Sequence, residues 1–195
     1  MRDEIKQLIK TIYVDHRTDL FNQGCSREID FIDELIHKIG EMTDKVDRWP
    51  RENEPAEEIY ISVNTKTIGD IQIKYHSILY ICKIAKYYYL QHEIWMDNPD
   101  DERIAPDLGD FGDEGFNKKQ FSMDEMIVQY LTEKGYERLW YREMEESFHE
   151  PVYSNAFKCD EYLTVKTALF MDYIDINKAD FSEDSDIPPI RGLWI

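Results

Sequence analysis

Two Glu-x-x-His pairs have the residue types and spacing best suited to metal chemistry in this chain. They are Glu34 with His37 and Glu146 with His149. At positions i and i+3 of a helix, two side chains point the same way, and carboxylate-bridged di-iron bundles present their ligands in this manner. Such a bundle needs two further helices that each supply a Glu, whereas the middle of this chain has a strand pattern. The main hypothesis is therefore a protein without a cofactor. The alternative hypothesis is an enzyme with this carboxylate and histidine metal site.

Other catalytic patterns are absent from the sequence. There is no GxSxG motif for a serine nucleophile and no GxxxxGK[ST] or GxGxxG loop for binding phosphate. Cys25 follows Gly24, but no neighbouring residue is a general base for it. The three cysteines, Cys25, Cys82 and Cys159, are far apart and form no CxxC pair, which favours reduced thiols in a cytoplasmic protein.

The beginning of the chain and its most apolar window also favour a cytoplasmic location. Residues 1–6 carry charges where a signal peptide needs apolar residues. The most apolar window, residues 78–96, is interrupted by Lys83, Lys86 and Glu93, so it does not fit a membrane span.

The charge balance narrows the class of partner. The chain has 195 residues, with 41 acidic and 23 basic side chains and a formal net charge of −18. This balance strongly disfavours direct binding to the nucleic-acid backbone, because phosphates are neutralised by clustered Lys and Arg. Residues 101–150 hold 14 acidic and 6 basic side chains, so this segment contributes −8 of the net charge of −18. One quarter of the sequence is therefore the candidate for a concentrated negative surface.

Aromatic residues are interleaved with the acids of this quarter. Buried aromatic anchors surrounded by charge are typical of tight and fast protein interfaces. The competing interpretation is a solvated face that only keeps the protein soluble. The predicted partner-binding residues are Asp107, Asp110, Phe111, Asp113, Glu114, Trp140, Glu143, Glu145 and Glu146.

This general profile, small and acidic without a catalytic motif, resembles that of the immunity proteins that bacteria make against toxins. Immunity proteins cap a toxin domain, which is usually a basic nuclease. The resemblance concerns composition and covers no motif. It implies a non-enzymatic inhibitor with a basic toxin or nuclease domain as its partner, without direct contact to nucleic acid or membrane. A phage-type inhibitor that mimics the charge of nucleic acid has the same profile.

The expected architecture is a single α+β domain over residues 1–195, with an antiparallel sheet flanked by helices. Residues 1–49 are predicted to be helical, and their second helix runs from an N-cap at Ser26 to Trp49. Residues 58–95 are predicted to be strands, since Ile71, Ile73 and Tyr75 alternate with polar neighbours. The spacing of apolar residues over 78–95 also fits a helix, but its dense Ile and Tyr content favours two strands. Residues 65–67 and Gly69 supply the turn between the first two of these strands.

The second half is predicted to be mainly helical. Residues 97–117 read as an acidic loop, since they hold too little apolar surface for an element. Residues 122–175 are predicted to be helical, with a capping box at Ser122–Glu125, an end at Gly135, and further helices over 136–148 and from Thr164. The side chain of Trp140 is predicted to point inward from the helix over 136–148. Residues 180–195 form an acidic tail whose last three residues are expected to dock on the protein.

Overall fold

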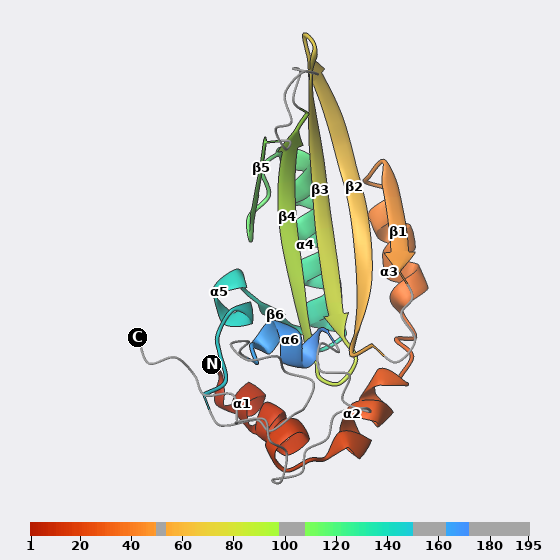
Figure 1. Cartoon of the computed structure of the whole chain (residues 1–195). Coiled ribbons are helices and arrows are strands. Elements are labelled where there is room, and N and C mark those ends of the chain that lie inside the picture. Colours follow the sequence, from red (N-terminus) through yellow and green to blue (C-terminus); the bar gives the residue numbers. More distant parts are fainter. Residues whose placement is uncertain (50–53, 98–107, 150–162, 172–195) are drawn as a thin grey trace.

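The computed structural model describes residues 1–49, 54–97, 108–149 and 163–171 (Figure 1). It has the predicted α+β architecture, with one sheet and several helices. Five strands follow one another across the sheet in the order of the sequence, each antiparallel to the next. They are β1 (Lys45–Trp49), β2 (Ala56–Ile68), β3 (Ile71–Cys82), β4 (Tyr87–Met96) and β5 (Leu108–Gly112). A short sixth strand, β6 (Glu137–Leu139), pairs in parallel with the first residues of β4.

Two helices, α3 (Ile32–Gly40) and α4 (Lys118–Glu133), pack on one face of the long strands, and other helices gather at the lower end of the sheet. The other described helices are α1 (Asp3–Ile9), the π-helical turn η1 (Lys10–Val14), α2 (Thr18–Cys25), α5 (Tyr141–Met144) and α6 (Val165–Leu169). In Figure 1, α4 lies behind the middle strands, while α1, α2 and α6 gather at their lower end. No helix in the described part of the chain has the length and apolar character needed to cross a bilayer.

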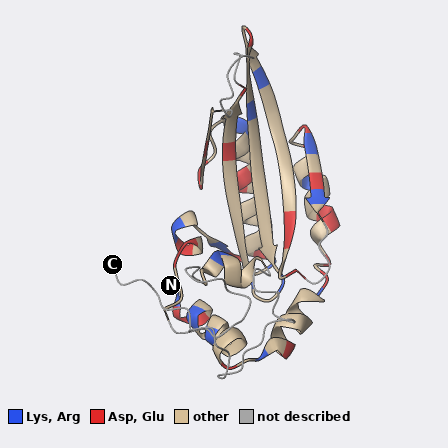
Figure 2. Cartoon of the chain, viewed as in Figure 1, with Lys and Arg blue, Asp and Glu red and all other residues tan. Residues whose placement is uncertain are grey.

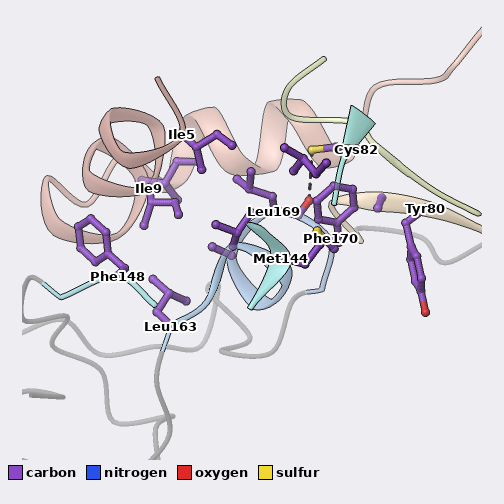
Figure 3. Close-up of a cluster of buried hydrophobic side chains, with 14 of the residues drawn as sticks. Ile5, Ile9, Tyr80, Cys82, Met144, Phe148, Leu163, Leu169 and Phe170 are labelled. Atoms are coloured by element: carbon purple, nitrogen blue, oxygen red, sulfur yellow. Dashed lines mark hydrogen bonds between the residues drawn. The ribbon is translucent and has the colours of Figure 1, made fainter. Parts of the chain in front are cut away.

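Two apolar cores follow from this arrangement. The first core packs α1, η1 and α6 against the lower end of the sheet, where the thiol of Cys82 donates to the carbonyl of Leu169 at 3.2 Å (Figure 3). The second core lies between the sheet and the pair α3 and α4. On β2 its side chains are Ile59, Ile61 and Val63, which alternate with half-exposed residues because successive strand residues point to opposite faces.

The predicted strand region, residues 58–95, is confirmed. Its turn differs in detail, because residues 65–67 belong to β2 and the chain reverses at Gly69 and Asp70. Gly69 has a φ of +62°, a left-handed conformation that costs glycine little. The tight hairpin therefore depends on the glycine at this position.

The predicted helix from Ser26 to Trp49 is wrong at both ends. Ser26 caps the C-terminus of α2, where its hydroxyl donates to the carbonyl of Asn22 at 2.7 Å. Val46 continues the helical spacing of apolar residues, but it lies in β1, which pairs with β2. Strand pairing thus overrides the helical pattern in the last five residues of the predicted helix.

The acidic loop predicted over residues 97–117 contains the strand β5, and residues 98–107 lie outside the described residues. The capping box at Ser122–Glu125 is wrong, because the N-cap of α4 lies five residues before Ser122. This N-cap is Asn117, whose side chain accepts the N–H of Gln120 at 3.0 Å. The predicted end of this helix at Gly135 is confirmed by a φ of +77°.

The single helix predicted over residues 136–148 is replaced by β6 and the short α5. The inward orientation predicted for Trp140 is wrong, because 46% of its surface is exposed. The helix predicted from Thr164 is confirmed as α6, whose N-cap Thr164 accepts the N–H of Thr167 at 3.2 Å. Residues 172–175 of the predicted helical region and the tail 180–195 lie outside the described residues.

Candidate binding surface on the open face of the sheet

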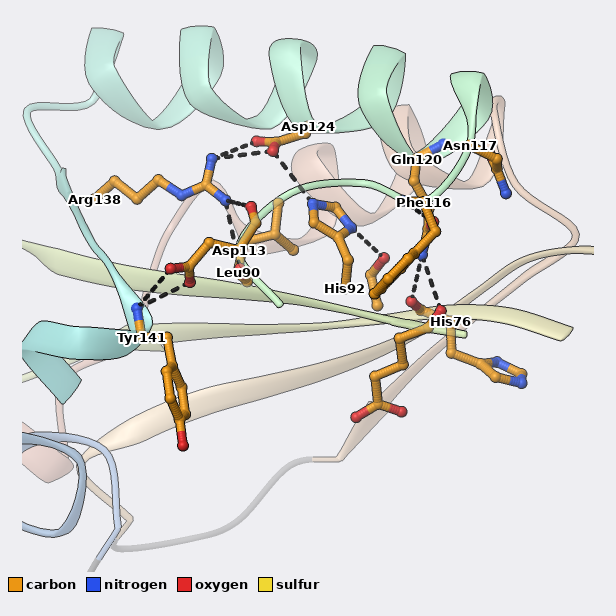
Figure 4. A network of polar contacts seen from close by, with 12 residues as sticks. His76, Leu90, His92, Asp113, Phe116, Asn117, Gln120, Asp124, Arg138 and Tyr141 are labelled. Carbon is orange, nitrogen blue, oxygen red and sulfur yellow. Dashed lines mark hydrogen bonds and ion pairs between the residues drawn. The ribbon is translucent and has the colours of Figure 1, made fainter. Parts of the chain in front are cut away.

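The two faces of the sheet differ in what covers them. Cross-strand partners share a face, so His76 of β3, Glu93 of β4 and Phe111 of β5 project from the same side. The other side carries the second core and α4. In Figure 1, no described element crosses the front of β2, β3 and β4 above their lower ends. Figure 4 shows the rings of His76 and Tyr141 on the side of the sheet that is opposite to α4.

At its lower end the uncovered side is closed by α6. Tyr80 stacks on Tyr89 with 6.2 Å between ring centroids and meets Phe170 edge-on at 6.4 Å. Above this point the side chains are half-buried or exposed, except that of Glu93, which is buried. We call this region the open face. Its residues are Tyr60, His76, Gln91, Glu93, Trp95 and Phe111.

A row of hydrogen bonds along β4 fixes the carboxylate of Glu93 at the centre of the open face. The amide Nε2 of Gln91 donates to Oε1 of Glu93 at 2.7 Å, and the indole Nε1 of Trp95 donates to Oε2 at 2.9 Å. Residues 91, 93 and 95 share a face because they are two positions apart in a strand. Hydrogen bonds between its own side chains therefore hold this part of the open face in a defined conformation.

Two further groups surround this carboxylate from the direction of β2. The rings of Tyr60 and His76 lie 5.3 Å apart and are tilted by 30°. Burial lowers the pKa of His76, although the nearby charge of Glu93 acts in the opposite direction. Burial also raises the pKa of Tyr60, and the negative charges of Glu93 and Asp47 add to this effect. The rings of His76 and Tyr60 therefore both lie within the electrostatic field of Glu93.

One side of the open face is bordered by residues that the sequence predicted to bind a partner. The ring of Phe111 meets the ring of Tyr141 edge-on, with 5.4 Å between centroids. The carboxylate of Asp113 accepts the backbone N–H of Tyr141 at 2.9 and 3.1 Å (Figure 4). The structure thereby brings residues 110–114 and the beginning of α5 together. We call Asp110, Asp113, Glu114 and Tyr141 the acidic rim. Asp110 is the cross-strand partner of Ile94, so its side chain projects from the other face of β5 at this edge of the sheet.

The remaining predicted partner-binding residues have different environments. Glu145 is exposed, whereas Glu143 bonds to Arg2 at 2.7 Å and Glu146 pairs with the amino terminus of Met1. Burial alone would raise the pKa of Glu143, but the hydrogen bonds from Arg2 and the backbone N–H of Trp140, together with the charges of Arg2 and the amino terminus, outweigh it and the pKa is lowered. These two acids hold the beginning of the chain against α5. Asp107 lies outside the described residues.

Behind the sheet, on the side of α4, lies a buried polar network (Figure 4). Ser77 Oγ and His92 Nδ1 are 2.9 Å apart, and His92 Nε2 lies 3.2 Å from an Asp124 carboxylate oxygen. The guanidinium of Arg138 donates to the same carboxylate at 2.7 and 3.0 Å and to the carbonyl of Asp113 at 2.8 Å. Sequence reasoning missed this network.

A serine, a histidine and an aspartate in hydrogen-bonded order are the residues of a hydrolase triad. Here Ser77 and His92 are both fully buried beneath α4, so a substrate cannot reach the serine. Asp124 is neutralised by Arg138, and Arg138 also lies over the ring of Trp140, with 4.4 Å from guanidinium carbon to ring centroid. The network connects α4, β4, β6 and the acidic rim, and its role is structural.

The alternative metal hypothesis does not match these positions. Glu34 and His37 are exposed on α3, where His37 lies 3.5 Å from Glu41 and Glu34 lies 3.6 Å from Lys38. Glu146 and His149 follow α5 and lie in no helix. In Figure 1, α3 and α5 lie near opposite edges of the sheet. Among the described residues, no three His, Cys, Asp or Glu side chains converge on a position for a metal ion.

A depression of about 360 Å³ lies between α1 and the β3–β4 turn. Its charged lining residues are Glu4, Lys86 and Glu137. Lys86 lies over the ring of Tyr136 at 4.2 Å, and Glu137 accepts a hydrogen bond from Arg2 at 2.8 Å. Two of its three charged groups are thus engaged within the protein rather than aimed at a ligand.

Gly109 leaves room for the indole of Trp95, because a Cβ atom at this position would lie 2.6 Å from the indole ring. We expect Gly109→Ala to displace the ring and to break its hydrogen bond to Glu93, at a cost of about 1 kcal/mol. The indole N–H resonance of Trp95, identified by its loss in Trp95→Phe, should move toward the position of a solvent-exposed indole.

Gly112→Ala is the matched control on the same strand, because a Cβ atom at Gly112 would meet no atom of the described residues within 4 Å. This variant should leave the Trp95 resonance unchanged. An unchanged Trp95 resonance in Gly109→Ala would contradict the packing of the indole against β5.

A scan against protein-family models and searches of curated proteins and of solved structures find no match to this chain. The function is therefore inferred from the open face and the acidic rim. Figure 2 shows few charged residues along β3 and β4, with more on β1, the helices and the loops. Exposed rings with a fixed carboxylate between them suit the binding of another molecule.

Proposed function

We propose that this chain is a non-enzymatic binding protein of the immunity type, which neutralises a basic toxin or nuclease domain by direct contact. The observation that carries the proposal is the exposed pair of Phe111 and Tyr141 beside Asp110, Asp113 and Glu114. Aromatic anchors next to like-signed charges suit an interface in which the rings bury area and the charges attract a partner of opposite sign. The excess of acids over bases supports the same partner class.

Hydrogen bonds within the protein hold the acidic rim in place, and this order further supports a role in binding a partner. Asp113 is held from two sides, through its carboxylate by Tyr141 and through its carbonyl by Arg138. A surface ordered before contact loses less conformational entropy on association, which favours affinity. The free thiols of Cys25 and Cys82 in the described part of the chain suit the cytoplasm as the place of action.

Capture from the source organism tests the partner class. The immobilised protein is exposed to a lysate, and the bound proteins are identified by mass spectrometry and then purified. We expect a protein with a net positive charge whose activity falls to its baseline when one equivalent of this chain is added. Bound proteins that are acidic, or that keep full activity at saturation, would contradict the proposal.

Neutralising the acidic rim should slow the association with that partner. We expect the triple variant Asp110→Asn, Asp113→Asn and Glu114→Gln to associate about 3–10-fold more slowly at low salt, because it removes part of the steering field. At 1 M salt, where the Debye length is about 3 Å, the difference should largely disappear. Stopped-flow mixing at both salt concentrations measures the rates.

A control with the same change in net charge separates the rim from the total charge. Glu28→Gln, Asp30→Asn and Glu41→Gln also remove three exposed acids, but these lie before and after α3 rather than at β5. This variant should associate at a rate within about twofold of the wild-type rate. Equal slowing in both triple variants would mean that the acidic rim has no special role.

A further inference from the structure

Glu93 lies in the centre of the open face and is almost completely enclosed by side chains. Only 9% of its surface is exposed. Its cross-strand partners are His76 on one side and Phe111 on the other, and its neighbours along the strand face are Gln91 and Trp95. The carboxylate is thus bordered by the aromatic rings of Trp95 and Phe111, the imidazole of His76 and the amide of Gln91.

In the described part of the chain, the carboxylate of Glu93 forms no ion pair, and Lys74 on the same face of β3 pairs with Asp97 at 2.6 Å instead. Its two hydrogen bonds come from neutral donors, the amide of Gln91 and the indole of Trp95. Among the described residues, no Lys or Arg side chain lies within 4.0 Å of its oxygens. Buried charges in proteins are as a rule paired with an opposite charge, because desolvation without a partner is costly.

The carboxylate retains the capacity to accept more hydrogen bonds. Each oxygen of an ionised carboxylate has two acceptor positions, and each oxygen of Glu93 receives one donor from this chain. Trp95 and Phe111, which are 39% and 49% exposed, lie beside it with their rings accessible. A cation arriving from solvent would therefore meet acceptor oxygens and aromatic rings at the same position.

These features select a guanidinium group among biological cations. Guanidinium is planar, donates to both oxygens of a carboxylate and stacks on aromatic rings, whereas ammonium is a compact and strongly hydrated charge. The protein itself uses this combination elsewhere. Arg138 donates to the carboxylate of Asp124 and lies over the ring of Trp140 at 4.4 Å.

We propose that the open face binds an arginine side chain of the basic partner, with its guanidinium group on Glu93 and against the rings of Trp95 and Phe111. This inference rests on the proposed function and adds the residue type that the partner inserts. Charge complementarity identifies the occupant, since the acids of the acidic rim attract a basic surface toward this edge of the sheet, next to Phe111.

The test uses a hexa-arginine peptide as the probe and a hexa-citrulline peptide as its uncharged counterpart. Binding is followed by the indole N–H resonance of Trp95, which reports on the bond to Glu93. We expect the arginine peptide to shift this resonance in a saturable manner and the citrulline peptide to leave it unchanged. The variant Glu93→Gln should weaken the binding of the arginine peptide about tenfold or more.

Glu41→Gln is the control for the loss of one negative charge, because Glu41 is exposed at the end of α3. It should change the affinity for the peptide by less than about twofold. Phe111→Leu is a second variant that keeps an apolar side chain without the ring, and it should also weaken binding. Amide spectra of the variants report whether each one is folded.

The outcomes separate this inference from the proposed function. If the captured basic partner binds Glu93→Gln as tightly as the wild type, the arginine site is wrong although the inhibitor function stands. If the arginine peptide leaves the Trp95 resonance unchanged at millimolar concentration, the arginine site is also wrong. If the peptide binds through Glu93 but every captured partner is acidic, the site is supported and the inhibitor function fails.

Discussion

Replacing Asp124 with Ala is expected to lower the free energy of unfolding by about 3–5 kcal/mol, because it leaves two buried cationic or polar partners without their acceptor. The carboxylate of Asp124 bonds to the guanidinium of Arg138 at 2.7 and 3.0 Å and to the imidazole of His92 at 3.2 Å. His92 is fully buried and only 10% of the side chain of Arg138 is exposed. Because both groups are buried, water cannot fully replace the lost carboxylate as their hydrogen-bond acceptor.

Urea unfolding followed by circular dichroism measures this loss. The matched control is Asp19→Ala, because Asp19 forms a comparable bond to Arg17 at 2.8 Å, but with both side chains more than half exposed. Exposed ion pairs contribute about 0–1 kcal/mol, so the control should be nearly as stable as the wild type. A loss below about 1 kcal/mol for Asp124→Ala would refute the structural role of the network.

The pH dependence of stability should change in the same variant. Burial alone would raise the pKa of Asp124, but the bonds from His92 and Arg138 outweigh it and the folded-state pKa is lowered. A carboxyl with a lowered folded-state pKa stabilises the protein above its unfolded pKa of about 3.9, and the contribution disappears as pH falls through the folded value. Asp124→Ala should therefore lose less stability than the wild type between neutral pH and pH 3.

The long strands of the sheet were predictable because their apolar residues alternate over many positions. In β3, Ile73 and Tyr75 pack toward the second core with polar residues between them. The end of α4 at Gly135 and the cap at Thr164 were also predictable, since both depend on residues within one turn of the chain. Local rules and long periodic patterns thus account for the central part of the fold.

The short strands were not predictable from local pattern. β5 has the sequence LGDFG, whose two glycines and one aspartate disfavour strands, and it exists because its backbone pairs with β4. β1 and β6 occupy only five and three residues, and their sequences fit a helix equally well. For such segments, tertiary pairing decides the structure rather than propensity.

The candidate site was predicted in part. Phe111 and the acids at 110–114 were found from their interleaved charge and aromatic character, and the structure brings them together with Tyr141. Glu93 was missed because its importance depends on which side of the sheet α4 covers. The signal was nevertheless present in β4, where Gln91, Glu93 and Trp95 alternate with residues that face α4.

The second large effect concerns a buried ion pair at the lower end of the sheet. Glu57 of β2 accepts a bond from Arg48 of β1 at 3.0 Å and lies 3.7 Å from the ammonium group of Lys83. The side chains of Glu57 and Lys83 are each only 7% exposed, and Lys83 also donates to the carbonyl of Cys25 at 3.1 Å. We expect Glu57→Ala to cost about 3–5 kcal/mol, because the ammonium group of Lys83 then remains buried without a carboxylate.

The double variant Glu57→Leu and Lys83→Met tests that explanation against a simple loss of packing. Replacing both charges by apolar side chains of similar volume removes the desolvation penalty together with the attraction, and such exchanges are often close to neutral. Urea unfolding should therefore find the double variant more stable than Glu57→Ala by at least about 2 kcal/mol. If the double variant is as unstable as Glu57→Ala, then the bonds of Glu57 to Arg48 and of Lys83 to Cys25 determine the stability, and the unpaired charge does not.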